Sequence, residues 1–492
     1  MKQQLRTVRG RPAALAMFGL GVATVWLVLV SVIAVIAMSP QHDALVAAGR
    51  QPHTAVADAT QDAAVATTTS TTVPETTTTP ANAPKPPTPS DPTPAGVTAL
   101  PPTSAPGDTT GVTDTEIRIG IHAPETVAGA PLNLAADPIK GMKTYAQFIN
   151  DHGGIFGRKL VLDIQDDGAS AESARQAAAT MINDHKDFIV SGTLGIDQIA
   201  IVAAEAYKRG VPYLAGGGSE TKPIPGMFQL TASYQTMVQS LANYMKTDAN
   251  LKGKRIGILA STSQYIRPAA DDFKRDLEAN GFAVSTIVAA QGPADNPDYN
   301  SYILQFQRAN TQVVVPLTDP VTTSQIVQRC VSGAACGWTY SFVDFAHDWD
   351  LSLKLMSPTW QSQRVRGLAT SCYYRDPAIA DAAKCGAMGK ARDQFVSING
   401  QNAWDKEGSG AAFGYQVISM IKGALYACGR NLTRERFVQA LKSYTNYSDI
   451  VTGPITFAGS TNTMHGSTAM AVYEAQDNST YKMVSPGMRA AF

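Results

Sequence analysis

The chain has 492 residues, of which 40 are basic and 40 acidic, so its formal net charge is zero. This neutrality gives no support for a nucleic-acid partner, and the length exceeds the roughly 150 residues of an average domain. The composition becomes globular only beyond residue 110.

The N-terminus combines a basic tail with a long uncharged run. Residues 1–12 hold four basic side chains and no acid, and residues 13–38 hold no charged side chain. A helix over 13–38 would extend about 39 Å, enough to cross a bilayer core of about 30 Å. A cleaved secretory signal usually has an apolar run of roughly 7–15 residues. We therefore expect an uncleaved, single-pass membrane anchor with the C-terminal part extracytoplasmic, and a cleaved signal is the alternative.

Residues 39–110 are rich in threonine and proline, with threonine runs at 67–72 and 76–79. Such a stretch buries too little apolar surface to fold, so we expect a disordered linker. It could be an unmodified flexible tether or a stalk that carries O-linked sugars.

Strand-like and helix-like stretches alternate from residue 117 onward. Strands are predicted at 117–121, 160–165, 188–191 and 211–215, with helices between them at 140–150, 170–184 and 198–209. This alternation is typical of helices that cross over a parallel sheet, whose ligands bind at loops beyond the carboxyl ends of the strands. Small and hydroxyl residues fill those loops, at 126–130, 192–195 and 216–219. The pattern predicts an α/β lobe with a binding crevice.

A second lobe of similar order is predicted to follow. Its strands are expected at 255–260, 282–289, 313–315 and 339–343, and its helices at 236–247, 268–280, 297–309 and 324–330. A returning strand at 364–373 precedes helices at 377–396, 410–428 and 433–442, the last with Thr433 as N-cap. Strands at 453–457 and 469–474 are expected to close the chain, with a polar turn region between them.

The five cysteines are Cys330, Cys336, Cys372, Cys385 and Cys428. Disulfides are the default outside the cytoplasm, and five cysteines allow at most two. The first choice is the sequence-local pairs, Cys330–Cys336 and Cys372–Cys385, which leaves Cys428 buried and free. The absence of any CxxC argues against a metal site, and we expect no cofactor.

Three motifs stand at the start of the globular part: GVTD at 111–114, NDHGGIFGRK at 150–159 and DDG at 166–168. Together they resemble the opening of the leucine/isoleucine/valine-binding proteins, which are type I periplasmic binding proteins serving ABC importers. The resemblance extends over about 111–485 and implies two Rossmann-like α/β lobes joined by three hinge crossings, near 229–231, 366–368 and 450–453. Lobe 1 would comprise 112–230 and 367–450, and lobe 2 would comprise 231–366 and 451–492.

The resemblance implies a ligand held between the lobes. Residues 195–197 match the loop that holds the ligand carboxylate, where Ile196 offers only its backbone N–H. An aromatic residue is expected where Tyr265 stands, and an acid that holds the ligand ammonium where Asp344 stands. The candidate ligand-binding residues are Thr126, Gly195, Ile196, Asp197, Gly217, Gly218, Ser219, Tyr265, Asp319 and Asp344.

Several candidates also have purely structural readings. Asp197 could cap the following helix, Asp344 could pair with Lys354, and Tyr265 could cap the interface between the lobes. The three acids, which include Asp319, suit a cationic or polyol-like ligand as readily as a branched amino acid.

The leading function is a membrane-tethered, extracytoplasmic solute-binding protein that captures an amino acid or similar polar solute for an ABC permease. It would not be an enzyme, because no Gly-x-Ser-x-Gly elbow or other catalytic pattern occurs. The alternatives are a ligand-sensing module that signals through a partner and a degenerate, non-binding protein of the cell envelope.

Overall fold

The computed structural model describes residues 94–126, 135–216, 224–264, 266–292, 297–332, 336, 339–343, 366–459, 470–475 and 481–485. All of them belong to one compact unit, Asn82–Phe492. The predicted anchor at 13–38 lies outside these ranges. Within them, no helix has both the length and the apolar character needed to cross a membrane.

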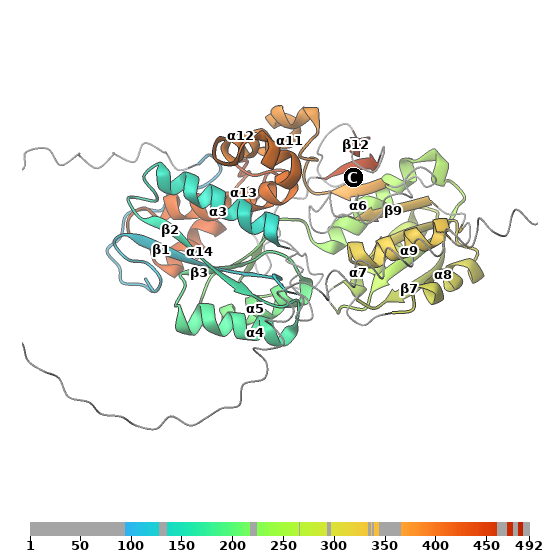
Figure 1. Ribbon diagram of the computed structural model, residues 1–492, viewed down its shortest axis with the longest axis horizontal. Helices are drawn as coiled ribbons and strands as arrows, with labels where there is room; N and C mark the ends of the chain where they lie inside the picture. Colours follow the sequence, from blue (N-terminus) through green and yellow to red (C-terminus); the bar gives the residue numbers. More distant parts are fainter. Residues whose placement is uncertain are drawn as a thin grey trace, which may run out of the picture. The chain divides into compact units, whose positions relative to one another are not determined.

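The first lobe is built on a five-stranded parallel sheet (Figure 1) with the order β2-β1-β3-β4-β5. Its strands are β1 (Glu116–Ala123), β2 (Lys159–Asp166), β3 (Ile189–Gly192), β4 (Tyr213–Ala215) and β5 (Met227–Gln229). In β1, an interior strand, Ile117, Ile119 and Ile121 are fully buried on one face, and Gly120 and His122 are buried on the other. Burial on both faces is expected for a parallel sheet that is covered by helices on each side.

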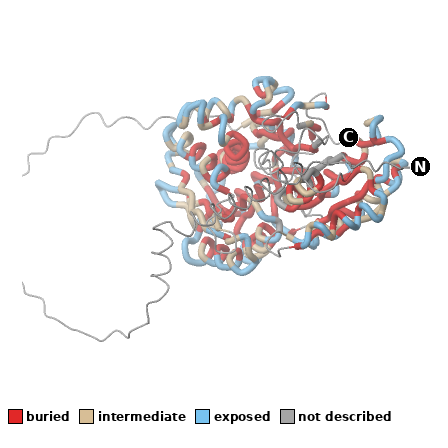
Figure 2. Tube along the Cα trace, turned by 45° about the vertical axis from the view of Figure 1, so that its right-hand side comes forward, coloured by how far each residue is buried: buried red, intermediate tan, exposed pale blue. Residues whose placement is uncertain are grey.

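Helices cover both faces of this sheet (Figure 1). On one face lie α3 (Ala136–Asp151) and α13 (Gln401–Cys428), and on the other lie α4 (Ala171–Ala179) and α5 (Ile196–Lys208). Glycines allow α3 and α13 to pack backbone against backbone, because a Cβ at Gly414 would lie 2.4 Å from the backbone nitrogen of Met142. Figure 2 shows the result, with buried chain inside and exposed helix faces outside.

The second lobe is built on a seven-stranded sheet with the order β12-β11-β10-β9-β8-β6-β7. Its strands are β6 (Arg255–Ser261), β7 (Ala283–Ala290), β8 (Val313–Leu317), β9 (Thr339–Val343), β10 (Arg366–Ala369), β11 (Ala471–Ala475) and β12 (Tyr481–Met483). The neighbouring strands from β7 to β10 in this order are parallel. Strand β11 pairs antiparallel with β10, and β12 pairs antiparallel with β11. Its helices are α6 (Tyr234–Thr247), α7 (Arg267–Ala279), α8 (Tyr299–Arg308) and α9 (Pro320–Ser332).

Two predicted elements differ in kind from the structure, and the helix expected at 410–428 begins earlier, at Gln401. The helix expected at 377–396 is divided into η5 (Pro377–Ala380), α11 (Ala382–Cys385) and α12 (Met388–Asn399). The first break falls at Asp381, where the backbone is extended, and the second at Gly386, whose φ of 55° does not continue an α-helix. No strand forms at 453–457, where the backbone pairing is a single bridge between Ile455 and Tyr447.

The prediction of a disordered linker up to residue 110 is wrong for its last part. Residues 94–110, which we call the strap, lie along α13 and α14 (Arg434–Lys442). The Leu100 N–H donates to the Ala427 carbonyl at 2.9 Å, and the Arg434 guanidinium pairs with Asp108 at 2.7 Å. Val97 and Leu100 pack against the main core, so a few apolar residues anchor a stretch that is rich in proline, threonine and small residues.

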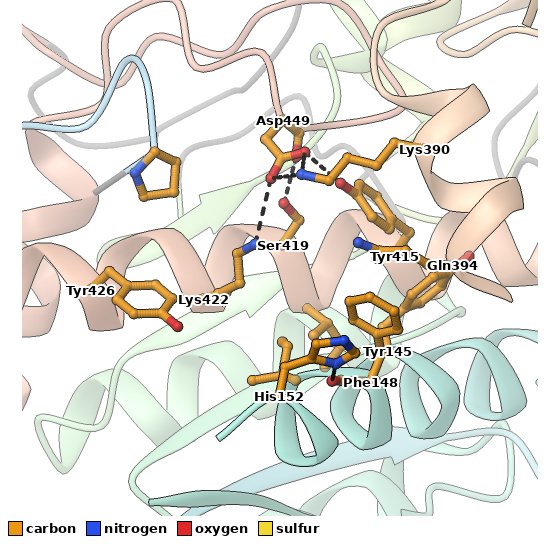
Figure 3. Close-up of a pocket in the computed structure, with 13 residues that line it drawn as sticks. Tyr145, Phe148, His152, Lys390, Gln394, Tyr415, Ser419, Lys422, Tyr426 and Asp449 are labelled. Carbon is orange, nitrogen blue, oxygen red and sulfur yellow. Dashed lines mark hydrogen bonds and ion pairs between the residues drawn. The ribbon is translucent and has the colours of Figure 1, made fainter. Parts of the chain in front are cut away.

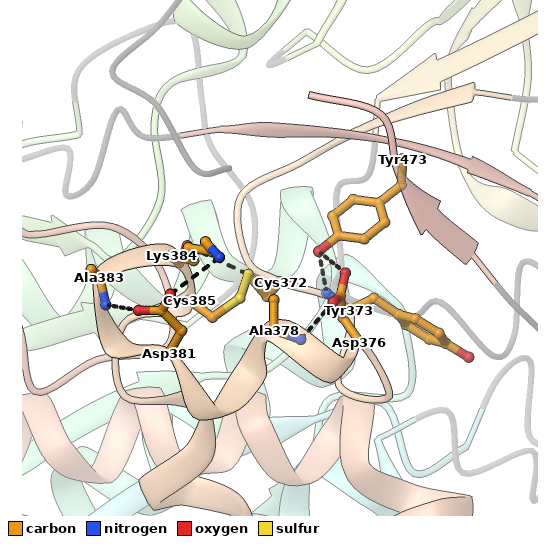
Figure 4. The surroundings of a disulfide bond; sticks show 9 residues. All are labelled: Cys372, Tyr373, Asp376, Ala378, Asp381, Ala383, Lys384, Cys385 and Tyr473. Atoms are coloured by element: carbon orange, nitrogen blue, oxygen red, sulfur yellow. Dashed lines mark hydrogen bonds and ion pairs between the residues drawn. A yellow bond between two sulfur atoms is a disulfide. The ribbon is translucent and has the colours of Figure 1, made fainter. Parts of the chain in front are cut away.

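The structure contains the two sequence-local disulfides, Cys330–Cys336 and Cys372–Cys385. The second (Figure 4) lies where the chain leaves β10 for the helices of the first lobe. Just before it, Ser371 forms an antiparallel bridge with Thr452, so two crossings between the lobes run side by side. Cys428 is buried and free, and burial raises the pKa of its thiol to about 12.

Candidate ligand-binding site

Loops from the two lobes meet at the carboxyl ends of their strands. Asp197 lies in the first turn of α5, after β3, and Ser263 lies between β6 and α7. The Ser263 hydroxyl donates a hydrogen bond of 2.9 Å to a carboxylate oxygen of Asp197. This contact joins the two places where a parallel sheet offers its ligand-binding loops.

The loop before α5 depends on Gly195, which has a φ of 88° and stands at the N-cap position of the helix. A Cβ at this position would lie 2.5 Å from the side-chain oxygen of Gln198. Glycine therefore allows the chain to turn directly into α5 at Ile196, where the first backbone N–H groups of the helix are not bonded within it. Such N–H groups suit a ligand carboxylate.

Two other candidates make contacts within their own lobes. The Thr126 hydroxyl and backbone N–H donate to Asp166 at 2.7 and 3.1 Å. Burial favours a protonated Asp166, but these and neighbouring hydrogen bonds outweigh it and lower the pKa of that carboxyl. Asp319 accepts the Thr322 N–H at 2.8 Å in the first turn of α9. Both carboxylates therefore order loops at the carboxyl ends of the strands.

Five predicted positions lie outside the described residues, and their roles stay predictions. They are Gly217, Gly218, Ser219, Tyr265 and Asp344. The structure thus brings the Asp197 loop against the loop of Ser263, which precedes Tyr265 by two residues.

Sequence reasoning missed a buried polar chain beneath the first-lobe loops. His122 Nδ1 lies 2.8 Å from Asp167 and its Nε2 lies 2.7 Å from the Tyr213 hydroxyl. His122 and Asp167 are fully buried, and the Thr193 N–H donates to the His122 carbonyl. These buried hydrogen bonds hold the loops at the carboxyl ends of the first-lobe strands in position. The signal was available, because His122 is the penultimate residue of β1 and DDG follows the neighbouring parallel strand.

Gly192 is required for this packing. A Cβ at Gly192 would lie 2.4 Å from both His122 Nε2 and the Tyr213 hydroxyl. The glycine at the end of β3 therefore lets the imidazole and the phenol meet beneath the loop.

Comparison with known proteins relates most of the chain to one family. A family model described as periplasmic binding protein matches residues 116–480. The Leu/Ile/Val-binding protein homolog 3 of Brucella melitensis is 25% identical over 205 residues, 40% of this chain and 53% of that protein. The Leu/Ile/Val-binding protein BraC3 of Rhizobium johnstonii is 25% identical over 203 residues, with the same two shares. The chain spans about half the length of these relatives.

Solved structures share the fold at low sequence identity. A fatty acid ABC transporter substrate-binding protein from Thermomonospora curvata superposes with a TM-score of 0.64 and 16% identity, over 78% of this chain and 94% of its own. A branched-chain amino acid ABC transporter protein from Thermus thermophilus, with bound valine, superposes with a TM-score of 0.62 and 12% identity, over 77% of this chain and 97% of its own.

Proposed function

This chain belongs to the periplasmic binding protein family, in its type I leucine/isoleucine/valine-binding branch, and from this premise we propose that it captures a small solute for an ABC permease. Proteins of this family bind solutes and perform no catalysis, so the chain is a binding protein and not an enzyme. The observation that supports the proposal is the hydrogen bond between Asp197 and Ser263, because it joins two loops that follow parallel strands, one in each sheet, and ligands of such sheets bind at loops of this kind.

The proposed solute is an amino acid or a similar polar molecule. Two relatives are named for leucine, isoleucine and valine, and one solved neighbour holds valine. The first N–H groups of α5, after Gly195, would receive a carboxylate, and Asp344 would receive an ammonium group. Ser219 and Tyr265 would complete the site with a hydroxyl and an aromatic face.

The proposed location is the outer face of the membrane. The uncharged run at 13–38, after a basic tail, would act as the anchor, and the chain between it and Pro94 would act as the tether. Tethering keeps a binding protein near its permease and so raises the effective concentration of the binding protein at the permease.

The test is a thermal-unfolding screen of the full-length chain in detergent against amino acids, polyamines, sugars and carboxylic acids. A ligand at about 100 times its dissociation constant should stabilise the native state by about 2.7 kcal/mol. Tyr265→Ala and Asp344→Ala should reduce the shift, whereas Tyr207→Ala, at an exposed tyrosine of α5, should not. A shift that survives both site substitutions would reject the proposed residues. No shift with any class of solute would count against the binding function.

A further inference from the structure

Two adjoining cavities lie on the first lobe, where the described chain begins. The first, of about 420 Å³, lies between α3, α12 and α13 (Figure 3). The second, of about 1010 Å³, runs along α11 and α12 to the last crossing between the lobes. The two cavities share four lining residues: Pro94, Lys390, Gln394 and Asp449. They therefore form one continuous groove, which we call the strap groove.

One wall of the strap groove is aromatic. The rings of Phe148 and His152 stack with their centroids 4.2 Å apart, and the Tyr145 and Tyr415 rings meet edge to face at 5.0 Å. In Figure 3, Phe148 and His152 lie on the side of the cavity opposite Asp449. Phe148 is half-buried and His152 is exposed, whereas both tyrosines are buried. The stacked pair therefore presents the aromatic surface that an occupant of the groove would meet.

Gln394 supplies an uncommitted amide to the same groove. It stands on α12 and is half-buried, and within the described part of the chain its side chain has no hydrogen-bond partner. An amide group can donate two hydrogen bonds. A polyproline II backbone has no internal hydrogen bonds, so its carbonyls accept from donors outside the helix. The Gln394 amide is suited to such a backbone.

The chain that leads into the strap groove is rich in proline. The described chain begins at Pro94, in the groove, and residues 84–93 read Pro-Lys-Pro-Pro-Thr-Pro-Ser-Asp-Pro-Thr. Pro86, Pro89 and Pro92 recur at every third residue, which is the repeat of a polyproline II helix. In that conformation they would form one edge, which we call the proline edge. Ten such residues extend about 31 Å, whereas the 12 residues of α12 extend only about 18 Å.

We propose that residues 84–93 dock in the strap groove as a polyproline II helix, with the proline edge on the stacked pair of Phe148 and His152. Aromatic-lined grooves bind proline-rich segments in this way, because the helix is already extended and loses little entropy on binding. The Gln394 amide donates to a backbone carbonyl of the segment. Docking is intramolecular, because the segment continues directly from the strap, and its effective concentration is therefore on the order of millimolar.

The docked segment would also lie against a crossing between the lobes. Thr452 and Gly453 line the strap groove, and Thr452 pairs with Ser371 of the neighbouring crossing. A rearrangement of the lobes that shifts these crossings would change one rim of the groove. The part of the tether left free would then end at residue 83.

The experiment measures the mobility of a nitroxide label on Ser90→Cys in the full-length chain in detergent. Labelling is selective, because four native cysteines form disulfides and Cys428 is buried. Thr69→Cys, in the first threonine run, carries the reference label. By electron paramagnetic resonance, the rotational correlation time should be at least about threefold longer at position 90 than at position 69. Equal mobility at both positions would leave the groove to a partner protein and overturn the proposal.

Two sets of substitutions locate the docked segment. Phe148→Ser should raise the mobility of the label at position 90 to that of the reference, whereas Tyr207→Ser, at an exposed tyrosine of α5, should not. Replacing the three prolines of the proline edge with serine should have the same effect as Phe148→Ser. This second variant leaves the described part of the chain unchanged, so it decides the question if Phe148→Ser does not fold.

Two further outcomes would contradict the docking. A slow label that survives both sets of substitutions would place the segment elsewhere on the protein and reject the strap groove as its site. A slow component that decreases on dilution would show that the segment of a second copy fills the groove, and it would overturn the intramolecular docking.

Discussion

Replacing Asp187 with asparagine should change how the stability of the protein depends on pH. Asp187 is fully buried just before β3, and Arg118 Nε lies 3.3 Å from its Oδ1. A second carboxylate, Asp163, lies beside it and is paired with His185 at 2.7 Å. Burial, and then the hydrogen bond and charge of Asp163, raise the pKa of Asp187 to about 7.

The direction of this pH dependence follows from proton binding by Asp187 in the native and the unfolded state. The ordinary pKa of the aspartate is 3.8, so between pH 4 and 7 the unfolded chain loses this proton while the native state keeps it. The stabilisation from Asp187 is complete below the unfolded pKa and is lost as the pH rises through about 7. A shift of about three units corresponds to at most roughly 4 kcal/mol. The pKa of Asp163 is lowered, so its own contribution changes only in more acidic solution.

The assay is urea unfolding of the full-length chain at several pH values from 4.5 to 8. Asparagine stays neutral and can still donate to Asp163 and accept from Arg118. The free energy of unfolding of Asp187→Asn relative to wild type should therefore rise across this range, by up to roughly 4 kcal/mol. Asp184→Asn, at an exposed aspartate nearby, is the control. Parallel pH profiles for wild type and Asp187→Asn, or a relative loss of stability with rising pH, would refute the reasoning.

Three further variants test packing at separate places. Gly192→Ala forces a Cβ against His122 and should cost about 1–3 kcal/mol of unfolding free energy; a neutral result would mean that the loop relaxes freely. Converting Cys372 and Cys385 to alanine should lower the stability by about 2–4 kcal/mol in urea, and a reductant should have little further effect at this loop. Arg434→Met removes the ion pair to the strap and should speed amide exchange at residues 94–110, and unchanged exchange would show that the apolar contacts suffice.

The order of strands and helices in both lobes was predictable because hydrophobic periodicity is a local signal. The boundaries of α6 and β6 illustrate this, since they differ from the predicted ranges by at most two residues. The two strands without a prediction, β5 and β12, have three residues each, too few for a period to show. The break at Gly386 was less visible, because an isolated glycine within a helical pattern is often tolerated.

The site was less accessible to sequence reasoning because it depends on contacts between distant segments. The contact between Asp197 and Ser263 joins loops of different lobes, and no periodic pattern encodes it. The buried chain through His122 depends on register, since β1 and β2 align His122 with Gln165 and so place Asp167 beside the imidazole. Resemblance to a family suggested the loops but could not show that Thr126 is bonded to Asp166.

The strap has a mechanical consequence. It hydrogen-bonds to α13 through Leu100, and Gly96 accepts the Thr445 N–H at 2.8 Å, so the chain upstream of Pro94 is attached to the first lobe. A pull transmitted along that chain would load the backbone of α13 and α14 and would bypass the paired crossings at Ser371 and Thr452. Such a load would reach the second lobe only through the chain segments that cross between the lobes.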